Sequence, residues 1–447
     1  MGLQLLKEES LFAAEFSEFI RNRCANEPAW LRILREKSFA EFEQIGFPTV
    51  KEEDWKYTNV APIAKTTFRP AWTDRETRLE AGDFSSLIYD ESRDSSLVFI
   101  NGVFQPEFFN ASRLSQIVVM PFTEALTSSP HAPLIREHFE RYGGAGENGF
   151  TRLNAALSDG VFVLIPANVN LDAPLELLFV TDHEQGSPLA VFPRVLIMGE
   201  ENSSATIIES YASRSNGQYF TDAIIDFVVA DGARFQHYKL QRESTAAFHI
   251  ADTRVSVRAG AKYETATINL GAALSRHDIA VTFEEEGGEC AVDGLYMISA
   301  NQHSDTHSMI DHRQPHCTSH QLYKGVLDGR SHAVFNGKVF VRHGAQQTNA
   351  QQTNKNLLLS DEARVDTKPQ LEIFADDVKC AHGAAVGQLD QDELFYLESR
   401  GINPGLARNL LTYGFAEEVI EKIKIDSIKR ELDAVVLNRL HSGLEIA

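Results

Sequence analysis

Residues 161–386 consist of short runs in which apolar and polar side chains alternate. The runs are rich in Val, Ile, Phe, Tyr and Thr. Alternation with a period of two over four to eight residues is typical of β-strands that bury one face. The clearest runs are residues 161–165, 175–180, 205–209, 223–229, 234–240, 263–269 and 278–283. This part of the chain therefore predicts many short strands without helices between them.

One kind of turn separates these runs at a nearly constant interval. Its centres, Asn202, Gly232, Gly260 and Gly288, lie 30, 28 and 28 residues apart, and a similar turn follows at residues 361–364. A repeat without crossover helices excludes a doubly wound α/β sheet, and a β-sandwich does not need a constant turn. A parallel β-helix does need one, because each coil stacks on the previous coil. We therefore predict a mainly β fold with a parallel β-helix core at residues 159–388.

Helical patterns precede this core. Apolar residues at helical spacing over residues 10–45 predict two amphipathic helices, broken near Pro28 and ended by Gly46 and Pro48. Other helical patterns lie between residues 121 and 157. Asn101-Gly102 predicts a tight turn joining strands at residues 96–100 and 102–106. We expect a mostly helical N-terminal domain at residues 1–158.

Helix signals return after the core. A capping pattern begins at Asp390, and Gly401 occupies the position at which a helix usually ends. Asn403-Pro404 predicts the start of a second helix, which ends near Gly414, and two more are expected at residues 415–423 and 426–440. This C-terminal helical domain, residues 389–447, is small for an independent core, so we expect it to dock on the β-helix or on a partner.

Composition narrows the classes of partner. The 447 residues include 63 acidic and 42 basic side chains, for a formal net charge of -21. This charge argues against nucleic acid or an anionic membrane as the main partner. No apolar run approaches the roughly 20 residues that span a bilayer, and the N-terminal sequence lacks the features of a signal peptide. We expect a soluble protein in the cytoplasm.

Motifs for autonomous catalysis are missing from the sequence. The Gly-rich segment at residues 142–146 has no Lys-Ser or Lys-Thr after it, so it does not match a phosphate-binding P-loop. No G-x-S-x-G nucleophile motif is present. The four cysteines, at positions 24, 290, 317 and 380, form no C-x-x-C pair. An iron–sulfur cluster would therefore need ligands from another chain. Cys290 and Cys317 are expected in the core.

Two other groups of residues leave alternatives open. A concentration of histidines favours either a catalytic metal site or polar ladders and turns of the solenoid: His303, His307, His312, His316 and His320, with Cys317. Carboxylates and bases in the same region could serve a β-helix carbohydrate-active enzyme, or could form a solvated face: Asp305, Asp311, Asp328, Lys324 and Arg330.

Cys380 and His382 stand at the end of the last predicted strand. Residues at i and i+2 on a strand point to the same side, so a thiol and an imidazole could face one interface or one metal ion. The alternative is that both are ordinary residues of a strand end, because an isolated Cys-x-His falls short of the usual spacing of a metal site.

Several longer motifs resemble the SufB/SufD family of iron–sulfur cluster assembly scaffolds. They are DHRQPHCTS (311–319), YKGVLDG (323–329), VFNGK (334–338), QQTNA (346–350) with LLL (357–359), KPQLEI (368–373) and LESRGI (397–402), with EDWKYT (53–58) near the N-terminus. The resemblance covers about residues 161–440. It implies a right-handed parallel β-helix flanked by helical domains.

The resemblance also implies partners and roles. SufB and SufD pair through their β-helices, and the C-terminal helices of each dock one SufC subunit, an ABC-type ATPase. FADD (374–377) stands where SufB has its sulfur-accepting cysteine, so this chain is more similar to the SufD branch. By this resemblance His382, with Cys380 as the weaker candidate, would contact iron or a nascent cluster transiently shared with SufB. The ATPase would dock on a set of tail residues: Phe395, Leu397, Arg400, Gly401 and Leu410.

The resemblance therefore implies a scaffold subunit without catalytic turnover and without a stably bound cofactor. It would act in a SufB–SufC–SufD complex and contribute to iron entry and cluster formation at the SufB–SufD interface. Two rivals remain: a β-helix carbohydrate-active enzyme, and a structural module that forms homodimers.

Overall fold

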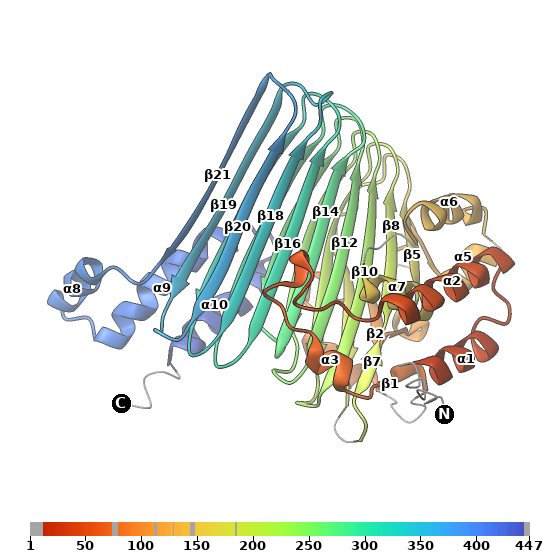
Figure 1. The fold of residues 1–447 in the computed structure, drawn as a ribbon, viewed down its shortest axis with the longest axis horizontal. Helices are drawn as coiled ribbons and strands as arrows, with labels where there is room; N and C mark the ends of the chain where they lie inside the picture. The colour runs from red at the N-terminus through yellow and green to blue at the C-terminus, as the bar shows by residue number, and fades with distance from the viewer. Residues whose placement is uncertain are drawn as a thin grey trace, which may run out of the picture.

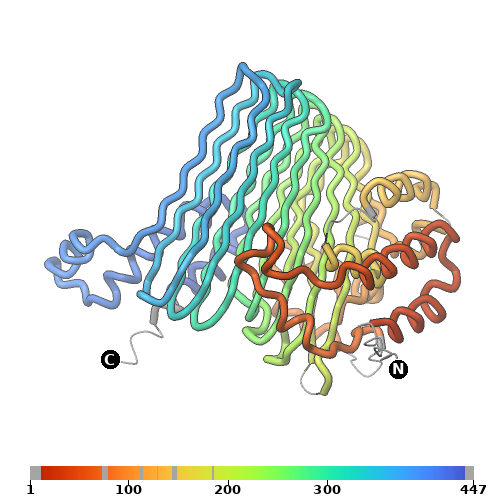
Figure 2. The backbone as a smooth tube through the Cα atoms, in the orientation of Figure 1, coloured from red at the N-terminus to blue at the C-terminus, as the bar shows by residue number. Residues whose placement is uncertain are grey.

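Two parallel sheets form the body of the protein in the computed structural model, which describes residues 12–73, 79–110, 114–127, 129–143, 148–183 and 186–441 (Figure 1). From β8 onward, successive strands alternate between the sheets, so each strand pairs with the strand two positions away in the chain. Figure 2 follows the resulting coils from β5 to β21. The mainly β fold and its parallel β-helix are thereby confirmed.

The strands of the two sheets have the following bounds. Sheet A contains, in spatial order, β4 (Val118–Pro121), β5 (Asp159–Ile165), β8 (Pro193–Gly199), β10 (Tyr219–Val229), β12 (Phe248–Val257), β14 (Leu274–Phe283), β16 (His303–His312), β18 (His332–Val341) and β20 (Arg364–Ile373), with β7 (Leu189–Val191) and β1 (Arg69–Pro70) beside β10. Sheet B contains β3 (Val103–Phe104), β2 (Ser96–Ile100), β6 (Leu175–Thr181), β9 (Ser204–Ser213), β11 (Arg234–Arg242), β13 (Lys262–Asn269), β15 (Glu289–Ile298), β17 (Thr318–Leu327), β19 (Thr348–Leu358) and β21 (Val378–Gly387).

Alternation along each strand separates an interior from two outer faces. On β12, Val255 and Val257 belong to the core between the sheets, whereas Phe248 and Ile250 pack outward against the N-terminal helices. Adjacent strands are in register, so the inward residues form columns that run through the stack; Val255, Val281, Ile310 and Val339 are one of them. Burial of these columns is the main contribution to the stability of the body.

The recurring turn places one residue per coil in the left-handed region. Asn202, Gly232 and Gly260 have φ values of 55°, 69° and 59°. The amide of Gly260 donates to the carbonyl of Glu286 in the next coil, 3.0 Å away, so the turns themselves form a ladder. The fourth centre is Gly287 (φ 72°), and the prediction of Gly288 was wrong by one residue. A side chain at position 288 would overlap the Phe283 ring, so that glycine serves close packing instead.

Seven helices precede the β-helix. They are α1 (Ala13–Asn22), α2 (Ala29–Ile45), α3 (Ala61–Lys65), α4 (Ala81–Phe84), α5 (Phe122–Thr127), α6 (Ala132–His138) and α7 (Gly149–Leu157), counted over the described ranges. Most of them pack on part of the outer face of sheet A, whereas α4 packs on β2 and β6 of sheet B. The predicted pair of N-terminal helices and the β2–β3 hairpin at Asn101-Gly102 are confirmed. β2 and β4 pair with β6 and β5, so both sheets begin before residue 159.

Three helices follow the β-helix, where the sequence predicted four. They are α8 (Gln391–Ser399), α9 (Pro404–Ile420) and α10 (Asp426–His441). The predicted break near Gly414 is wrong, because α9 continues through it. An interior glycine costs a helix only about 1 kcal/mol, and the burial of Ala416, Val419 and Ile420 against sheet B offsets that cost.

The described residues include no helix that is long and apolar enough to cross a membrane. The Gly-rich segment at 142–146 extends into residues outside the described ranges, as does the start of the pattern at residue 10.

Glycines inside the β-helix make room for tyrosine rings from neighbouring coils. A methyl group on Gly294 would overlap the ring of Tyr323, and one on Gly325 would overlap the ring of Tyr296. Both rings are buried between the sheets. At these two positions the interior is therefore filled by a large ring in one coil and a glycine in the neighbouring coil.

Gly294→Ala should lower the free energy of unfolding by about 2 kcal/mol, because the added methyl group displaces a packed ring. Chemical denaturation of the purified chain measures this change. Gly383→Ala is the matched control, since a methyl group on that strand meets nothing within 4 Å. Equal stability of the two variants would contradict the packing argument.

Candidate functional site

The last coil leaves the β-helix open at one end. β20 and β21 each pair with only one strand within the described part of the chain. Their free edges carry backbone groups that a further strand could satisfy. Large apolar side chains are exposed on or beside these strands: Ile373 (40%), Phe374 (47%) and Val386 (48%). This end of the molecule, the open end, therefore has the properties of an interface.

Cys380 and His382 both stand on the inward side of β21. Their register partners are Ala350, which belongs to the core, and the buried Gln352. Because no further coil covers β21, His382 is exposed, whereas Cys380 is half-buried against the core. Burial raises the pKa of the Cys380 thiol, and a backbone hydrogen bond at Ala350 partly offsets this rise. The thiol is accordingly less ready than an exposed one to become the thiolate that binds metal.

These two residues do not complete a metal site. No group of three or more His, Cys, Asp or Glu side chains with metal-binding geometry occurs among the described residues. A four-coordinate iron or a cluster needs more donors than these two, so further ligands would have to come from outside the described residues.

The predicted histidine cluster is dispersed by the strand geometry. His312 points inward and contacts the Ser319 hydroxyl at 2.9 Å, whereas His303 points outward and contacts Thr58 at 2.9 Å. Burial lowers the pKa of each of these two rings to about 4. His307 pairs with Asp305, 3.2 Å away. Of the two interpretations, polar ladders and turns match the structure. Cys290 and Cys317 lie in the core, as predicted.

The carboxylates and bases considered for sugar cleavage are also separated. Asp311 forms ion pairs with Arg313 and Arg342, at 2.8 and 2.9 Å. Lys324 lies on sheet B, under the tail. Arg330 lies in a turn, 3.6 Å from Glu362. Asp328 accepts a hydrogen bond from the amide of Gly329 in that turn. Each group has a structural partner, and they do not converge on one cleft.

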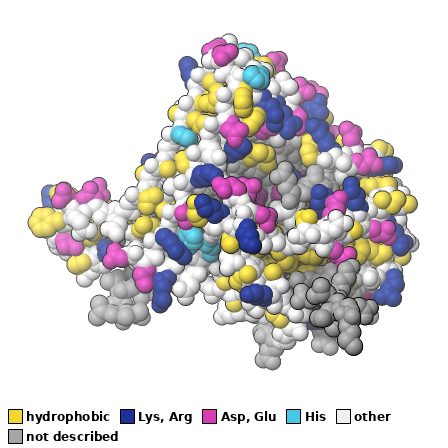
Figure 3. Space-filling view, viewed as in Figure 1, with side chains coloured by type: hydrophobic (Ala, Val, Ile, Leu, Met, Phe, Trp, Pro, Cys, Tyr) yellow, Lys and Arg dark blue, Asp and Glu magenta, His cyan; other side chains and the backbone are white. Residues whose placement is uncertain are grey.

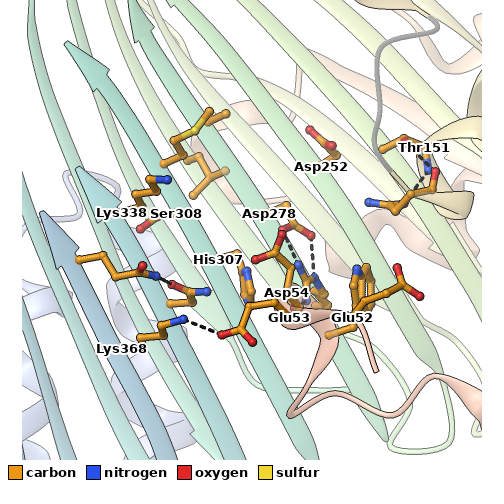
Figure 4. A pocket seen from close by; sticks show the side chains of 18 of the residues that line it. Glu52, Glu53, Asp54, Thr151, Asp252, Asp278, His307, Ser308, Lys338 and Lys368 are labelled. Atoms are coloured by element: carbon orange, nitrogen blue, oxygen red, sulfur yellow. Dashed lines mark hydrogen bonds and ion pairs between the residues drawn. The ribbon is translucent and has the colours of Figure 1, made fainter. Parts of the chain in front are cut away.

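A groove of about 690 Å³ separates the segment around Trp55 from the outer face of sheet A (Figure 4). Its ionic groups are mostly paired: Arg276 binds Asp278 at 2.8 Å, and Lys368 binds Glu53 at 2.9 Å. The Arg276 guanidinium also stacks on the Trp55 ring, 3.7 Å from its centroid. The EDWKYT segment thus anchors the N-terminal region across several coils.

The tail presents a separate apolar surface. On α8 and the first half of α9, Phe395 (71%), Tyr396 (57%), Leu406 (43%) and Leu410 (42%) are exposed. Figure 1 shows α8 projecting away from the body, and apolar side chains are visible at its outer end in Figure 3. We call these four residues the tail surface. Sequence reasoning named Phe395 and Leu410 but missed Tyr396 and Leu406, which a helical projection of α8 and α9 could have indicated.

The other predicted docking residues have different positions. Arg400 is exposed and stacks on Tyr396, with 5.1 Å between the guanidinium carbon and the ring centroid. Leu397 packs inward with Leu394. Gly401 has φ 83° and ends α8, as the sequence predicted.

The second half of the tail is bound tightly to sheet B. Lys324 on β17 donates to the carbonyl of Phe415 at 2.8 Å and pairs with Glu418 on α9. Lys422 pairs with Asp293 on β15 at 2.8 Å. Since α9 is continuous, it connects the tail surface to these two strands.

A clamp formed by Glu91 of the N-terminal region and Arg242 of β11 holds α10. The carboxylate of Glu91 accepts the Ser427 amide at 3.0 Å and the Ser427 hydroxyl, which caps the first turn of the helix. Arg242 binds both oxygens of Glu431 at 2.9 and 3.0 Å. Beneath the clamp, the carboxyl of buried Glu176 accepts hydrogen bonds from Tyr89 and Ser92. Burial raises the pKa of Glu176 to about 7.

Comparisons with known proteins converge on one family. Residues 179–415 match the SUF system FeS cluster assembly SufBD core domain, and residues 7–177 match the SufBD protein N-terminal region. The chain is 36% identical to an iron–sulfur cluster assembly SufBD family protein of Synechocystis, over 96% of this chain and 93% of that one. It is 32% identical to the iron–sulfur cluster assembly protein SufD of Escherichia coli (89% and 90% covered) and 30% identical to SufD of Bacillus subtilis (92% and 94%).

The buried carboxyl of Glu176 predicts a pH-dependent stability. Its folded pKa of about 7 exceeds that of an unfolded glutamate, so its contribution is present at low pH and is lost as the pH rises toward 7. Glu176→Gln removes this titration. The difference in free energy of unfolding between the variant and the parent, measured by urea denaturation, should shift by about 2 kcal/mol in favour of the variant as the pH rises from about 5 to about 8. Glu107→Gln, at an exposed carboxyl, should show no such gain. An equal pH dependence in both variants would contradict the assignment.

Proposed function

Because the chain belongs to the SufBD family of iron–sulfur cluster assembly proteins, we propose that it is the SufD-like scaffold subunit of a SufB–SufC–SufD complex. In this proposal it acts in the cytoplasm, has no catalytic turnover of its own and contributes to iron entry and cluster formation at its interface with SufB. The observation that carries the proposal is the exposed His382 on the inward side of an unpaired last coil.

The open end would pair with the corresponding end of SufB. Exposed apolar side chains and unpaired strand edges support this, because burial of both would stabilise a β-helix continued across two chains. His382 would then lie inside the interface rather than in water. Its imidazole would supply one ligand to iron or a nascent cluster, and the partner's side chains would supply the others. Cys380 is the weaker ligand, because its thiol is half-buried and its pKa is raised.

The tail surface would dock the SufC ATPase. Its four exposed apolar side chains form a patch that needs a partner, and the P-loop that this sequence lacks would belong to that partner. Movement of the docked ATPase would act on α8 and the first half of α9. The contacts of Lys324 and Lys422 would then pass the movement to β17 and β15, which lie close to the open end.

Two rival functions receive less support. A carbohydrate-active enzyme requires a cleft with converging carboxylates, and the candidate residues in the described structure are paired elsewhere. A homodimer could use the same open end when the chain is isolated, so it is a competitor for SufB rather than a different site.

Phe395→Asp combined with Leu410→Asp should abolish co-purification with the ATPase, because two charges would have to be buried in an apolar interface. Co-expression followed by affinity purification measures the association. The control is Ile33→Asp, at an apolar residue of α2 that is 64% exposed. Retention of the ATPase by the double variant would overturn this docking surface.

His382→Ala should reduce cluster assembly on the co-purified complex at least tenfold without a change in the thermal midpoint, since the ring is exposed. Iron content and the visible absorption spectrum report assembly. Cys380→Ala should have a smaller effect, and His320→Ala, at an exposed ring on β17, should have none. Full assembly by the His382 variant would remove the chemical basis of the proposal.

A further inference from the structure

A short polar chain leads from the core of the β-helix to His382. Gln352 on β19 is inward-facing and only 2% exposed, and it is the register partner of His382 on β21. Its amide nitrogen donates to the side-chain oxygen of Gln321 on β17 at 2.7 Å. The amide nitrogen of Gln321 donates in turn to the hydroxyl of Ser308 on β16, also at 2.7 Å.

This chain ends in an acceptor that has no partner. The Oε1 atom of Gln352 is buried and forms no hydrogen bond within the described structure. Other buried oxygens, such as Asn154 Oδ1 and Gln241 Oε1, share this state, but Gln352 differs from them in lying directly beneath the last, uncovered strand. The amide nitrogen of Gln352 is used by Gln321, and that of Gln321 is used by Ser308. The amide oxygen of Gln352 is therefore left to accept a hydrogen bond from another donor.

The neighbour that can supply a donor is His382. Adjacent parallel strands lie about 4.8 Å apart, and in-register residues on the same face are stacked at that spacing. His382 is therefore the residue stacked next to Gln352 on the open side, although its exposed ring donates no hydrogen bond to Oε1 in the structure. Space for the Gln352 amide comes from Gly337 on β18, because a methyl group there would overlap the amide nitrogen.

We infer that Gln352 is a positioning residue for His382: when the exposed ring turns toward β19, Oε1 accepts the N–H of the imidazole and thereby fixes the tautomer and the direction of the ring. The opposite ring nitrogen then carries its lone pair toward the open end, where it can bind a metal ion. Histidine ligands commonly donate their second N–H to an oxygen in this way, which orients the ring and increases its basicity. The inference rests on the proposed function, in which His382 binds iron.

The tautomer can be measured on the full-length, metal-free chain. Ring ¹⁵N shifts of labelled histidine average over the two tautomers, so at about pH 9, where imidazole is neutral, they report the tautomer ratio. Loss of the signal in His382→Ala assigns it. Gln352→Met removes the acceptor at nearly constant volume, and Gln352→Glu retains one. Gln351→Met is the matched control, because that glutamine is the sequence neighbour on the exposed outer face.

Gln352→Met should change the tautomer ratio of His382 about fivefold, the effect of losing one net hydrogen bond of about 1 kcal/mol. Gln352→Glu and Gln351→Met should leave the preferred tautomer as it is in the parent. Gln321→Met provides a second test, since it frees the Gln352 amide to rotate and should give an intermediate ratio. This variant remains informative if Gln352→Met does not fold.

An unchanged ratio in both Gln352→Met and Gln321→Met would overturn the positioning role. That result would leave the proposed function intact, because iron content of the complex with and without His382 tests it separately. Conversely, a shifted tautomer together with full cluster assembly by His382→Ala would support the hydrogen bond but not its connection to iron.

Discussion

In-register stacking of parallel coils is the constraint on which the rest of the structure depends. Each strand must place its inward residues over those of the strand before it, so a side chain in one coil is matched with residues about 28 positions away in sequence. A large ring in one coil is therefore matched either by a residue without a side chain, as with Tyr323 and Gly294, or by another ring that stacks on it, as with Phe179 and Tyr211. The same rule determines which side chains share a column with His382.

Stacking also determines where the protein can meet partners. The outer face of sheet A is covered in part by the N-terminal helices, and much of the outer face of sheet B is covered by α9 and α10. The first coils are extended by β2, β3 and β4. At the other end, β20 and β21 lack such neighbours within the described residues, and the tail surface projects beyond the body. The two proposed interfaces lie on these remaining surfaces, and α9 connects them.

Local sequence patterns predicted the elements better than their contacts. The turn interval and the alternation identified the β-helix because both repeat in every coil. The break at Gly414 was predicted wrongly because propensity gave no information on the burial of Ile420 against sheet B. The clamp from Glu91 to Ser427 joins residues 336 positions apart, so no local pattern could reveal it. The histidines were close in sequence but dispersed, because neighbours on a strand face opposite sides and the chain turns between strands.

The same reasoning explains why the sequence indicates His382 as a candidate but gives no signal for Gln352. His382 lies in a motif that can be compared with relatives, whereas Gln352 is one of many polar residues in an alternating strand. Its position matters only once the register shows that it faces inward, beside an apolar core. An apolar side chain there would avoid an unsatisfied acceptor, so the fold alone does not require glutamine at this position. The amide nitrogen of Gln352 has a partner in Gln321, and the proposed role toward His382 would give its oxygen a partner as well. The open end then differs from the rest of the body in one respect: the last residue of an inward column, His382, is exposed, whereas the residue beneath it in the column, Gln352, is buried.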